Sequence, residues 1–237
     1  PLVAMNTMLA DSLDWMAEQL TAAFATGSSK TEAVITVLQK LMNEHGNVVF
    51  GGNGYSPEWH RMAVEERGLR NLPTSAEALP VLQEEFVREL FKKTGVLTPV
   101  ELESRFNVYA EQYLLSIEVE AKLVIDMAKT LIYPAAINYL KLLSATGSGM
   151  AALGLELDKS TAATVAAELN AMMLAVTKLS EALAKHDFAS IEEHMTFCAS
   201  EVRALMVEVR LHADALEKEV ADELWPLPKY MEMLFIK

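Results

Sequence analysis

The stretch VVFGGNGYSPEW, residues 48–59, comes closest to a ligand-binding loop. Apolar residues lead into glycines and then into a helix start at Ser56-Pro57, a layout in which backbone N–H groups and a helix N-terminus can bind a phosphate. The spacing matches neither G-x-G-x-x-G nor G-x-x-x-x-G-K-[ST], and no lysine follows to reach a phosphate. Because Asn53-Gly54 is itself a strong turn dipeptide, the pattern favours a structural turn over a phosphate cradle.

The histidines and the cysteine do not form a recognisable catalytic or metal-binding motif. None of the five histidines follows a glutamate by three residues, the spacing that a di-iron helical bundle requires. His212 falls within an apolar seam, which favours a hydrogen-bonded core histidine over a metal ligand, and Cys198 is expected to pack as a small apolar residue. His194 follows two glutamates and is expected on a solvated face. We therefore assign no catalytic residue and no metal ligand.

Composition narrows the classes of partner. The 237 residues carry 33 acidic and 20 basic side chains, a formal net charge of −13, without a basic block. Nucleic acid and anionic membrane surfaces are therefore excluded as expected partners. No apolar run reaches the roughly 20 residues of a membrane span. A single cysteine rules out an internal disulfide and fits a reducing, cytoplasmic setting.

Helix start and stop signals predict a mainly α protein. Four segments have the form of a capping box, in which a Ser or Thr is followed three residues later by Glu: Ser29–Glu32, Thr74–Glu77, Thr98–Glu101 and Ser190–Glu193. Stop signals are expected at Gly27, Gly46, Gly95 and the Gly147–Gly149 segment. The one strand candidate, residues 47–50, is too short to form a sheet by itself.

Two apolar seams predict an up-down antiparallel bundle of long helices over residues 98–224. One helical pattern runs from Thr98 to about Ser144, with a kink expected near Tyr133 because Pro134 removes a hydrogen bond. Later positions step by four and three residues, as in antiparallel packing: Val165, Leu169, Met172, Val176, Leu179, Leu183, and then Ile191, Met195, Cys198, Val202, Leu205, Val209, His212, Leu216.

The remaining residues complete a three-part division. Residues 1–97 are expected to hold shorter helices and the Gly-rich loop, and residues 225–237 to form a C-terminal tail. Pro1-Leu2-Val3 reads as helix interior, with neither a cap nor a signal-peptide pattern ahead of it. We therefore expect that the chain is cut from a longer protein and that residues 1–97 pack against the preceding part.

Short motifs spread over the whole chain resemble the C-terminal portion of type III glutamine synthetases, the long-chain class of that family. The resemblance is carried by the order of these motifs along the chain: Gly52-Asn53-Gly54-Tyr55-Ser56, Glu58-Trp59, Glu66-Arg67-Gly68-Leu69, Glu101-Leu102-Glu103-Ser104-Arg105, Met127-Ala128-Lys129-Thr130 and Trp225-Pro226-Leu227-Pro228-Lys229-Tyr230.

The resemblance implies that this chain is the C-terminal part of an α+β catalytic domain whose active-site motifs lie upstream. A parent enzyme of this family ligates ammonia to glutamate with ATP through γ-glutamyl phosphate, using Mg²⁺ or Mn²⁺, and assembles as stacked rings. No cofactor site is implied for this chain. Its implied partners are the upstream catalytic domain and other copies of itself. Asn53, Tyr55 and Arg67 are the loop residues that we select for a structural role or for positioning groups that contact substrate.

Two other classes of protein remain open from the residues. One is a non-catalytic, stand-alone helical module that binds or scaffolds a partner. The other is a carboxylate-metal bundle enzyme, which would bind iron or manganese in this chain.

Overall fold

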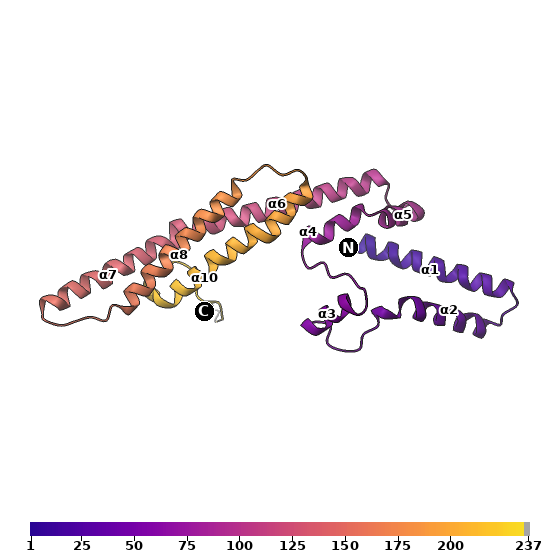
Figure 1. Ribbon diagram of the computed structural model, residues 1–237, viewed down its shortest axis with the longest axis horizontal. Helices are drawn as coiled ribbons and strands as arrows, with labels where there is room; N and C mark the ends of the chain where they lie inside the picture. Colours follow the sequence, from indigo (N-terminus) through magenta and orange to yellow (C-terminus); the bar gives the residue numbers. More distant parts are fainter. Residues whose placement is uncertain (235–237) are drawn as a thin grey trace. The chain divides into compact units, whose positions relative to one another are not determined.

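The computed structural model describes residues 1–234, which fold into two compact units, residues 1–109 and the described residues from Ala110 onward. Figure 1 shows the order of the helices. In the described residues we find helices, turns and irregular segments, and no strand. The two units meet within helix α6, between Tyr109 and Ala110, whereas the sequence analysis places its boundary at the start of that helix. The three-part division itself stays a prediction.

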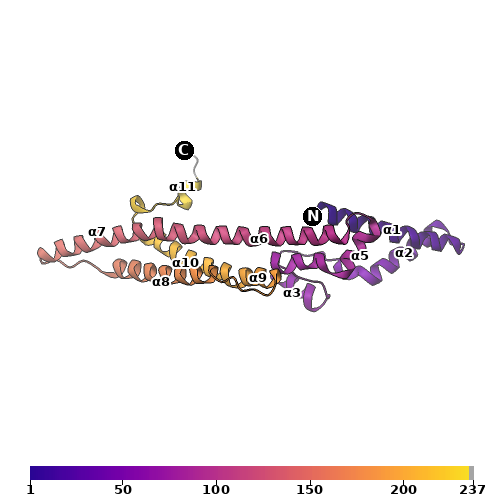
Figure 2. The same cartoon turned by 90° about the horizontal axis from the view of Figure 1, so that it is seen from above.

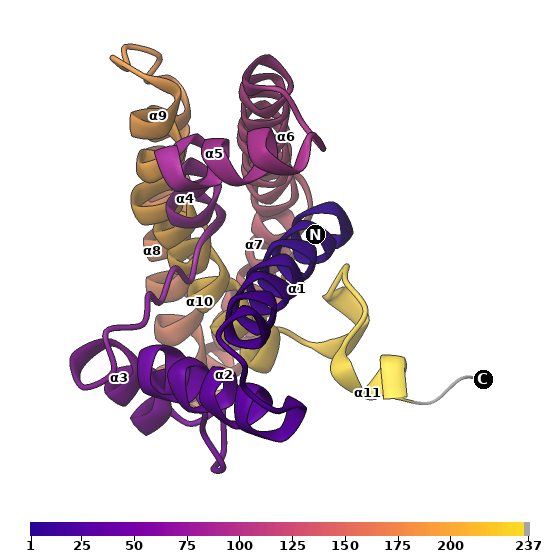
Figure 3. The ribbon, with the colours of Figure 1, turned by 90° about the vertical axis from the view of Figure 1, so that its right-hand side faces the viewer.

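The first unit contains short helices and one helical hairpin. It comprises α1 (Leu2–Ala25), α2 (Lys30–His45), the 3₁₀ turn η1 (Gly46–Val48), α3 (Pro57–Glu65), α4 (Ser75–Ala78), the 3₁₀ turn η2 (Leu79–Gln83), α5 (Glu85–Thr94) and the first turns of α6 (Pro99–Met127). Helices α1 and α2 lie side by side, as Figure 3 shows. The buried cluster of this unit is small, with Val87, Phe91 and Leu102 at its centre.

The second unit is a bundle of long helices. It comprises the rest of α6, the π-helical turn η3 (Ala128–Ile132), α7 (Tyr133–Ala152), α8 (Ser160–Leu183), α9 (Ile191–Phe197), the π-helical turn η4 (Cys198–Val202), α10 (Arg203–Glu219), the 3₁₀ turn η5 (Asp222–Leu224) and α11 (Tyr230–Leu234). Within this unit, α7 continues the line of α6, and α8 and α10 lie beside each other (Figure 2).

The predicted seams form the core of the bundle. Val165, Met172, Val176 and Leu179 of α8 are completely buried, and Leu183 at the end of the helix is half-buried. From the other seam, Met195, Cys198, Val202, Val209 and Leu216 are buried. Two side-chain pairs show that α8 and α10 run antiparallel, because Lys178 pairs with Glu208 whereas the earlier Glu168 pairs with the later His212. The mainly α bundle predicted from the sequence is confirmed.

The break expected in the long helix is a π-helical turn. Ala128–Ile132 ends two residues before Pro134, so the hydrogen-bond pattern changes in the turn that proline would disrupt. Both ends of this turn, Ala128 and Ile132, are buried in the core. The second π turn, Cys198–Val202, likewise buries its first and last residues. Both helices thus keep apolar residues on the core through the break.

Two of the four predicted helix ends differ in detail. Helix α7 does not stop at Gly147–Gly149 but continues to Ala152, and Gly154, with φ of +74°, makes the left-handed turn instead. The amide of Leu155 donates to the carbonyl of Met150 there, which completes the cap. Gly27 and Gly95 take the expected left-handed conformation. Gly46 does not, because the helical backbone continues through it into the 3₁₀ turn.

Three of the four predicted capping boxes form completely. Glu32, Glu77 and Glu101 each accept a hydrogen bond from the backbone of the capping residue, and the capping hydroxyl accepts one in return. In the fourth, the Ser190 hydroxyl caps the amide of Glu193 at 3.2 Å. Its glutamate, however, accepts from the amide of Ala189 and not from that of Ser190. The helix is still capped, so its start is as predicted.

Among the described residues, one helix has the length and composition to cross a membrane, namely α8. Six of its residues, including Val165, Met172 and Leu179, are buried in the bundle. Part of the apolar surface of α8 is therefore buried in the protein core.

The buried seam of α8 predicts that truncating neighbouring side chains of this helix changes the free energy of unfolding by very different amounts. Replacing the buried Met172 by Ala should lower the free energy of unfolding by about 2–5 kcal/mol, because it leaves a cavity. Leu174→Ala is the control, since Leu174 is 59% exposed and its truncation should cost no more than about 0.5 kcal/mol. Urea unfolding measures both. Equal effects of the two changes would show that α8 does not face the core as described.

Candidate functional site

The Gly-rich segment between η1 and α3 is organised by one arginine. The Arg67 guanidinium donates hydrogen bonds from Nη1 to the carbonyl oxygens of Asn47, at 3.2 Å, and Val49, at 2.6 Å. The Asn47 side-chain amide donates back to the Arg67 carbonyl at 2.9 Å. Gly68 follows with φ of +64°, a backbone conformation that suits glycine, and so turns the chain after Arg67. Arg67 thus ties the two ends of this segment together.

Two aromatic rings lie under this guanidinium. Phe50 and Trp59 stack with ring centroids 3.9 Å apart and planes 15° apart. The guanidinium carbon of Arg67 lies 5.0 Å from the Trp59 centroid and 5.6 Å from that of Phe50. A cation at this distance from aromatic rings is attracted by their electron-rich faces. A Cβ on Gly52 would lie 2.5 Å from the Phe50 ring, so a side chain at this position would displace the stack.

The strand expected at residues 47–50 is therefore wrong. Gly46–Val48 forms a 3₁₀ turn, and the carbonyl oxygens of Asn47 and Val49 are bonded to Arg67 instead of to a neighbouring strand. The sequence pattern could not show this, because Arg67 lies 18 residues beyond Val49. A side chain has taken over the hydrogen bonds that a sheet would have supplied.

The structure places the three selected residues in one loop with different surroundings. The Asn53 side-chain oxygen accepts a hydrogen bond from the amide of Tyr55 at 3.0 Å, which forms a local turn. Ser56 caps α3 by accepting from the amide of Trp59. The Tyr55 side chain is 94% exposed. Arg67 thus binds the ends of the loop, Asn53 shapes its tip, and Tyr55 projects into solvent. Their role in an enzyme stays a prediction.

The loop offers little that could hold a phosphate. The amide of Tyr55 is already bonded to Asn53, and the nearest guanidinium, on Arg67, is engaged with backbone oxygens and rings. In the part of the chain that the structure describes, no three His, Cys, Asp or Glu side chains lie close enough to hold a metal ion. The geometry of residues 1–234 therefore assigns neither a phosphate site nor a metal centre.

A second group of titratable residues surrounds a small cavity in the bundle. The cavity has a volume of about 40 Å³ and is lined by Leu114, Glu118, Ala182, Leu183, Lys185, His186, His194, Phe197, Cys198 and Val202. A space of this size holds about one water molecule. Cys198 is buried here, and burial, followed by the nearby charge of Glu118, raises the pKa of its thiol. The residue is a packing group and not an activated nucleophile, as the sequence predicts.

His194 does not lie on a solvated face, which corrects the sequence analysis. Its ring stacks on Phe188, with centroids 4.3 Å apart, because the short connection between α8 and α9 folds back over it. Burial lowers the pKa of His194, and the neighbouring His186 lowers it further. His212 is a hydrogen-bonded histidine, as predicted, and its partner is Glu168 of α8, 2.7 Å from Nδ1.

Comparison with known proteins identifies the family. The family model of the glutamine synthetase C-terminal domain matches residues 33–150, which include Asn53, Tyr55 and Arg67. A type-3 glutamine synthetase of Dictyostelium discoideum is 34% identical over 246 aligned residues, which cover 100% of this chain. This chain belongs to the glutamine synthetase family.

Two bacterial relatives support the same family assignment. A glutamine synthetase of Bacteroides fragilis (strain YCH46) is 28% identical over 100% of this chain, and one of Butyrivibrio fibrisolvens is 30% identical over 89% of it. The chain spans about a third of the length of these relatives: 33%, 34% and 31% in the order given. The comparisons therefore confirm the resemblance found in the sequence, for the part of a glutamine synthetase that carries the C-terminal domain.

The Arg67 contacts predict a local loosening in Arg67→Ala. Loss of the guanidinium leaves the carbonyl oxygens of Asn47 and Val49 without their donor, so the loop should open more often and be cleaved about 5- to 10-fold faster in limited proteolysis. Arg61→Ala is the control, since Arg61 pairs with Glu65 on the surface of α3. An unchanged cleavage rate in Arg67→Ala, mapped by mass spectrometry to residues 46–59, would contradict this role.

The lowered pKa of His194 predicts a stability loss in mild acid. The folded state resists protonation of this ring, whereas the unfolded chain accepts a proton near the ordinary pKa of 6.5. The contribution of His194 is therefore complete above about pH 6.5 and is lost as the pH falls from there through the folded-state pKa.

Urea unfolding of the wild type and of His194→Phe at pH 8 and pH 5 measures this loss. The wild type should lose more stability between the two values than the variant does. His45→Phe, at an exposed position of α2, is the control and should behave as the wild type. An equal pH dependence in the wild type and in His194→Phe would rule out His194 as the source.

Proposed function

We propose that this chain is the C-terminal helical segment of a type III-like glutamine synthetase. The parent enzyme would make glutamine from glutamate, ammonia and ATP through γ-glutamyl phosphate. The observation that carries this proposal is the similarity over 100% of the chain to a protein named type-3 glutamine synthetase. Similarity confined to one helix pair could reflect packing alone, but here it covers both structural units.

Within such an enzyme, the segment would support the fold and supply contacts between subunits. Its described residues offer a well-packed bundle and an ordered loop, with no group of side chains suited to a metal ion. ATP and Mg²⁺ or Mn²⁺ would therefore be held by the upstream catalytic domain, where the metal neutralises charge on the transferred phosphoryl group. We derive no catalytic step for residues of this chain. Assembly into a homo-oligomer and a cytoplasmic setting belong to the same proposal.

A stand-alone helical binding or scaffolding module is the second candidate. The observation that favours it is the amount of apolar surface on the helices, since residues such as Leu2, Leu115 and Leu211 are each more than 60% exposed. A surface of this kind marks sites of protein contact. The two candidates differ in what precedes this chain in the gene.

The nucleotide sequence upstream of the Pro1 codon, followed by an activity assay, tests the proposal. We expect an open reading frame that continues through metal-binding glutamates, and a full-length product that forms glutamine and ADP from glutamate, ammonia and ATP. The 237-residue chain alone should be inactive. A start codon directly before Pro1, or a full-length product without ligase activity, would refute the ligase and leave the helical module.

A further inference from the structure

The first half of helix α1 presents large apolar side chains to solvent. Leu2, Met5, Leu9 and Leu13 are 77%, 63%, 59% and 55% exposed. At 3.6 residues per turn these four positions fall within an arc of about 80° and so form one stripe along the helix. We call these four residues the α1 stripe. In a helix whose surroundings are complete, such a stripe faces the core.

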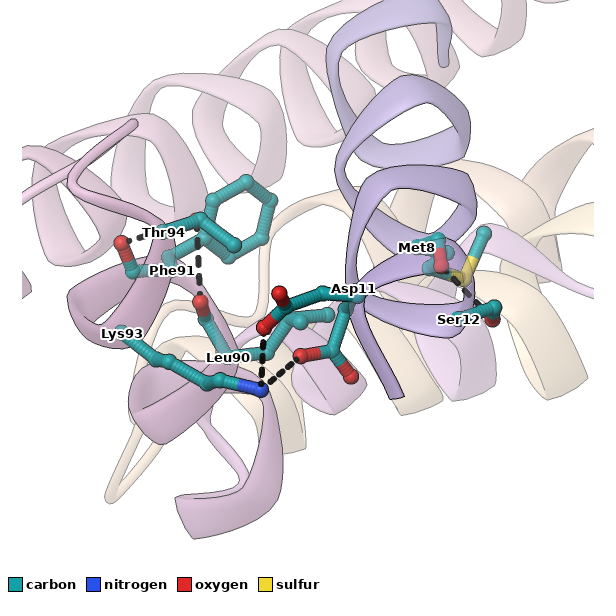
Figure 4. Close-up of polar contacts among 8 residues, drawn as sticks. Met8, Asp11, Ser12, Leu90, Phe91, Lys93 and Thr94 are labelled. Atoms are coloured by element: carbon teal, nitrogen blue, oxygen red, sulfur yellow. Dashed lines mark hydrogen bonds and ion pairs between the residues drawn. The ribbon is translucent and has the colours of Figure 1, made fainter. Parts of the chain in front are cut away.

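The opposite side of α1 makes the contacts with the rest of the first unit. Asp11 and Asp14 form ion pairs with Lys93 of α5, at 2.8 and 3.4 Å (Figure 4). Thr7 is buried, and Ala4 packs against the cluster around Phe91. By the same helical geometry, these residues centre about 180° from the α1 stripe. Over residues 2–14, small and acidic side chains therefore face α5 and the α1 stripe faces away, whereas farther along the helix Trp15, Met16 and Leu20 are half-buried.

The ion pairs between α1 and α5 contribute little to stability. Lys93 is 54% exposed and Asp11 is 37% exposed, so water screens their ion pair. Figure 4 shows Met8 and Ser12 on the far side of α1 from Lys93, and Met8 is 51% exposed. Burial of the α1 stripe would stabilise the helix more than these contacts do, and the described residues 1–234 do not supply it.

Helix α6 shows that this arrangement is not general. It exposes Leu115, Val119 and Leu123, but its opposite face buries Ile117 and Ala121 in the bundle. Its exposed apolar residues thus belong to a helix whose opposite face is already packed in the core. Helix α1 has no inner face buried to the same degree, because Thr7 is its one fully buried residue and its large side chains Trp15, Met16 and Leu20 are only half-buried.

We propose that the α1 stripe docks on an apolar surface of the catalytic domain that precedes this chain in the longer protein. This inference rests on the proposed function. The occupant follows from the comparisons: the chain covers 33% of the length of the Dictyostelium relative, and the domain it matches is the C-terminal one. Most of a relative-sized protein therefore lies outside residues 1–237, and the stripe is an apolar face of the first unit that the described residues leave uncovered. Helix α2 adds a second exposed apolar face with Val34, Leu38 and Met42.

Thermal unfolding of the full-length gene product tests the docking. The stripe variant carries Leu9→Gln and Leu13→Gln. The matched control carries Leu174→Gln and Leu211→Gln, which are 59% and 63% exposed on the bundle. We expect the stripe variant to unfold about 3–8 °C below the wild type, because two buried leucines are lost, and the control to stay within about 2 °C of it.

The 237-residue chain supplies the second arm. There the stripe is exposed already, so the stripe variant and the control should unfold within about 2 °C of each other. A full-length stripe variant that unfolds with its control would overturn the proposal. It would also be overturned if the isolated chain dimerised in analytical ultracentrifugation and the stripe variant dispersed the dimer while leaving the full-length protein unchanged, because the occupant would then be a second copy.

Ligase activity separates this inference from the function on which it rests. A full-length wild type that forms no glutamine, yet loses thermal stability on the stripe changes, refutes the ligase and supports the docking. If the full-length wild type forms glutamine and the stripe variant is as stable as its control, the ligase is supported and the docking is refuted.

Discussion

The antiparallel packing of α8 against α10 is the interaction on which the second unit depends. Met172, Leu179 and Leu216 are completely buried, and residues of α6 and α7 belong to the same cluster. Burial of this apolar surface is the main favourable term for such a fold. The pairs Lys178–Glu208 and Glu168–His212 cross the same two helices at its edge. Both pairs join positions that the antiparallel arrangement of these two helices brings together.

The first unit follows a different rule, because its buried cluster is small and polar contacts define its shape. Arg67 illustrates this: one guanidinium bonds the carbonyl oxygens of Asn47 and Val49 and covers the stacked rings of Phe50 and Trp59. A loop held in this way keeps its form without a sheet beneath it. The exposed Tyr55 at its tip is presented on a scaffold that one substitution can loosen.

These two patterns of stabilisation fit the assignment to the glutamine synthetase family. The relatives are about three times as long as this chain, which matches the part that carries the C-terminal domain. The bundle buries its own apolar core, whereas the α1 stripe is left exposed. A segment with one self-sufficient unit and one incomplete unit is what the proposed role as part of a larger enzyme requires.

The sequence by itself determined the class of fold, the helix starts and the two seams. Capping boxes and four-three spacing act over one or two turns of helix, so local pattern suffices to read them. The same holds for Cys198, whose place on the seam already indicates burial. The order of short motifs also identified the family, although not which of their residues contact one another.

Tertiary structure decided whatever depends on residues far apart in the chain. Residues 47–50 form no strand because Arg67, from beyond α3, takes their carbonyl oxygens. His194 is half-buried because the α8–α9 connection brings Phe188 onto its ring. The outward direction of the α1 stripe also came from the structure alone, because helical periodicity shows which residues share a face but not which face is covered. Which face is covered depends on the elements that pack against the helix, and these are set by the tertiary structure.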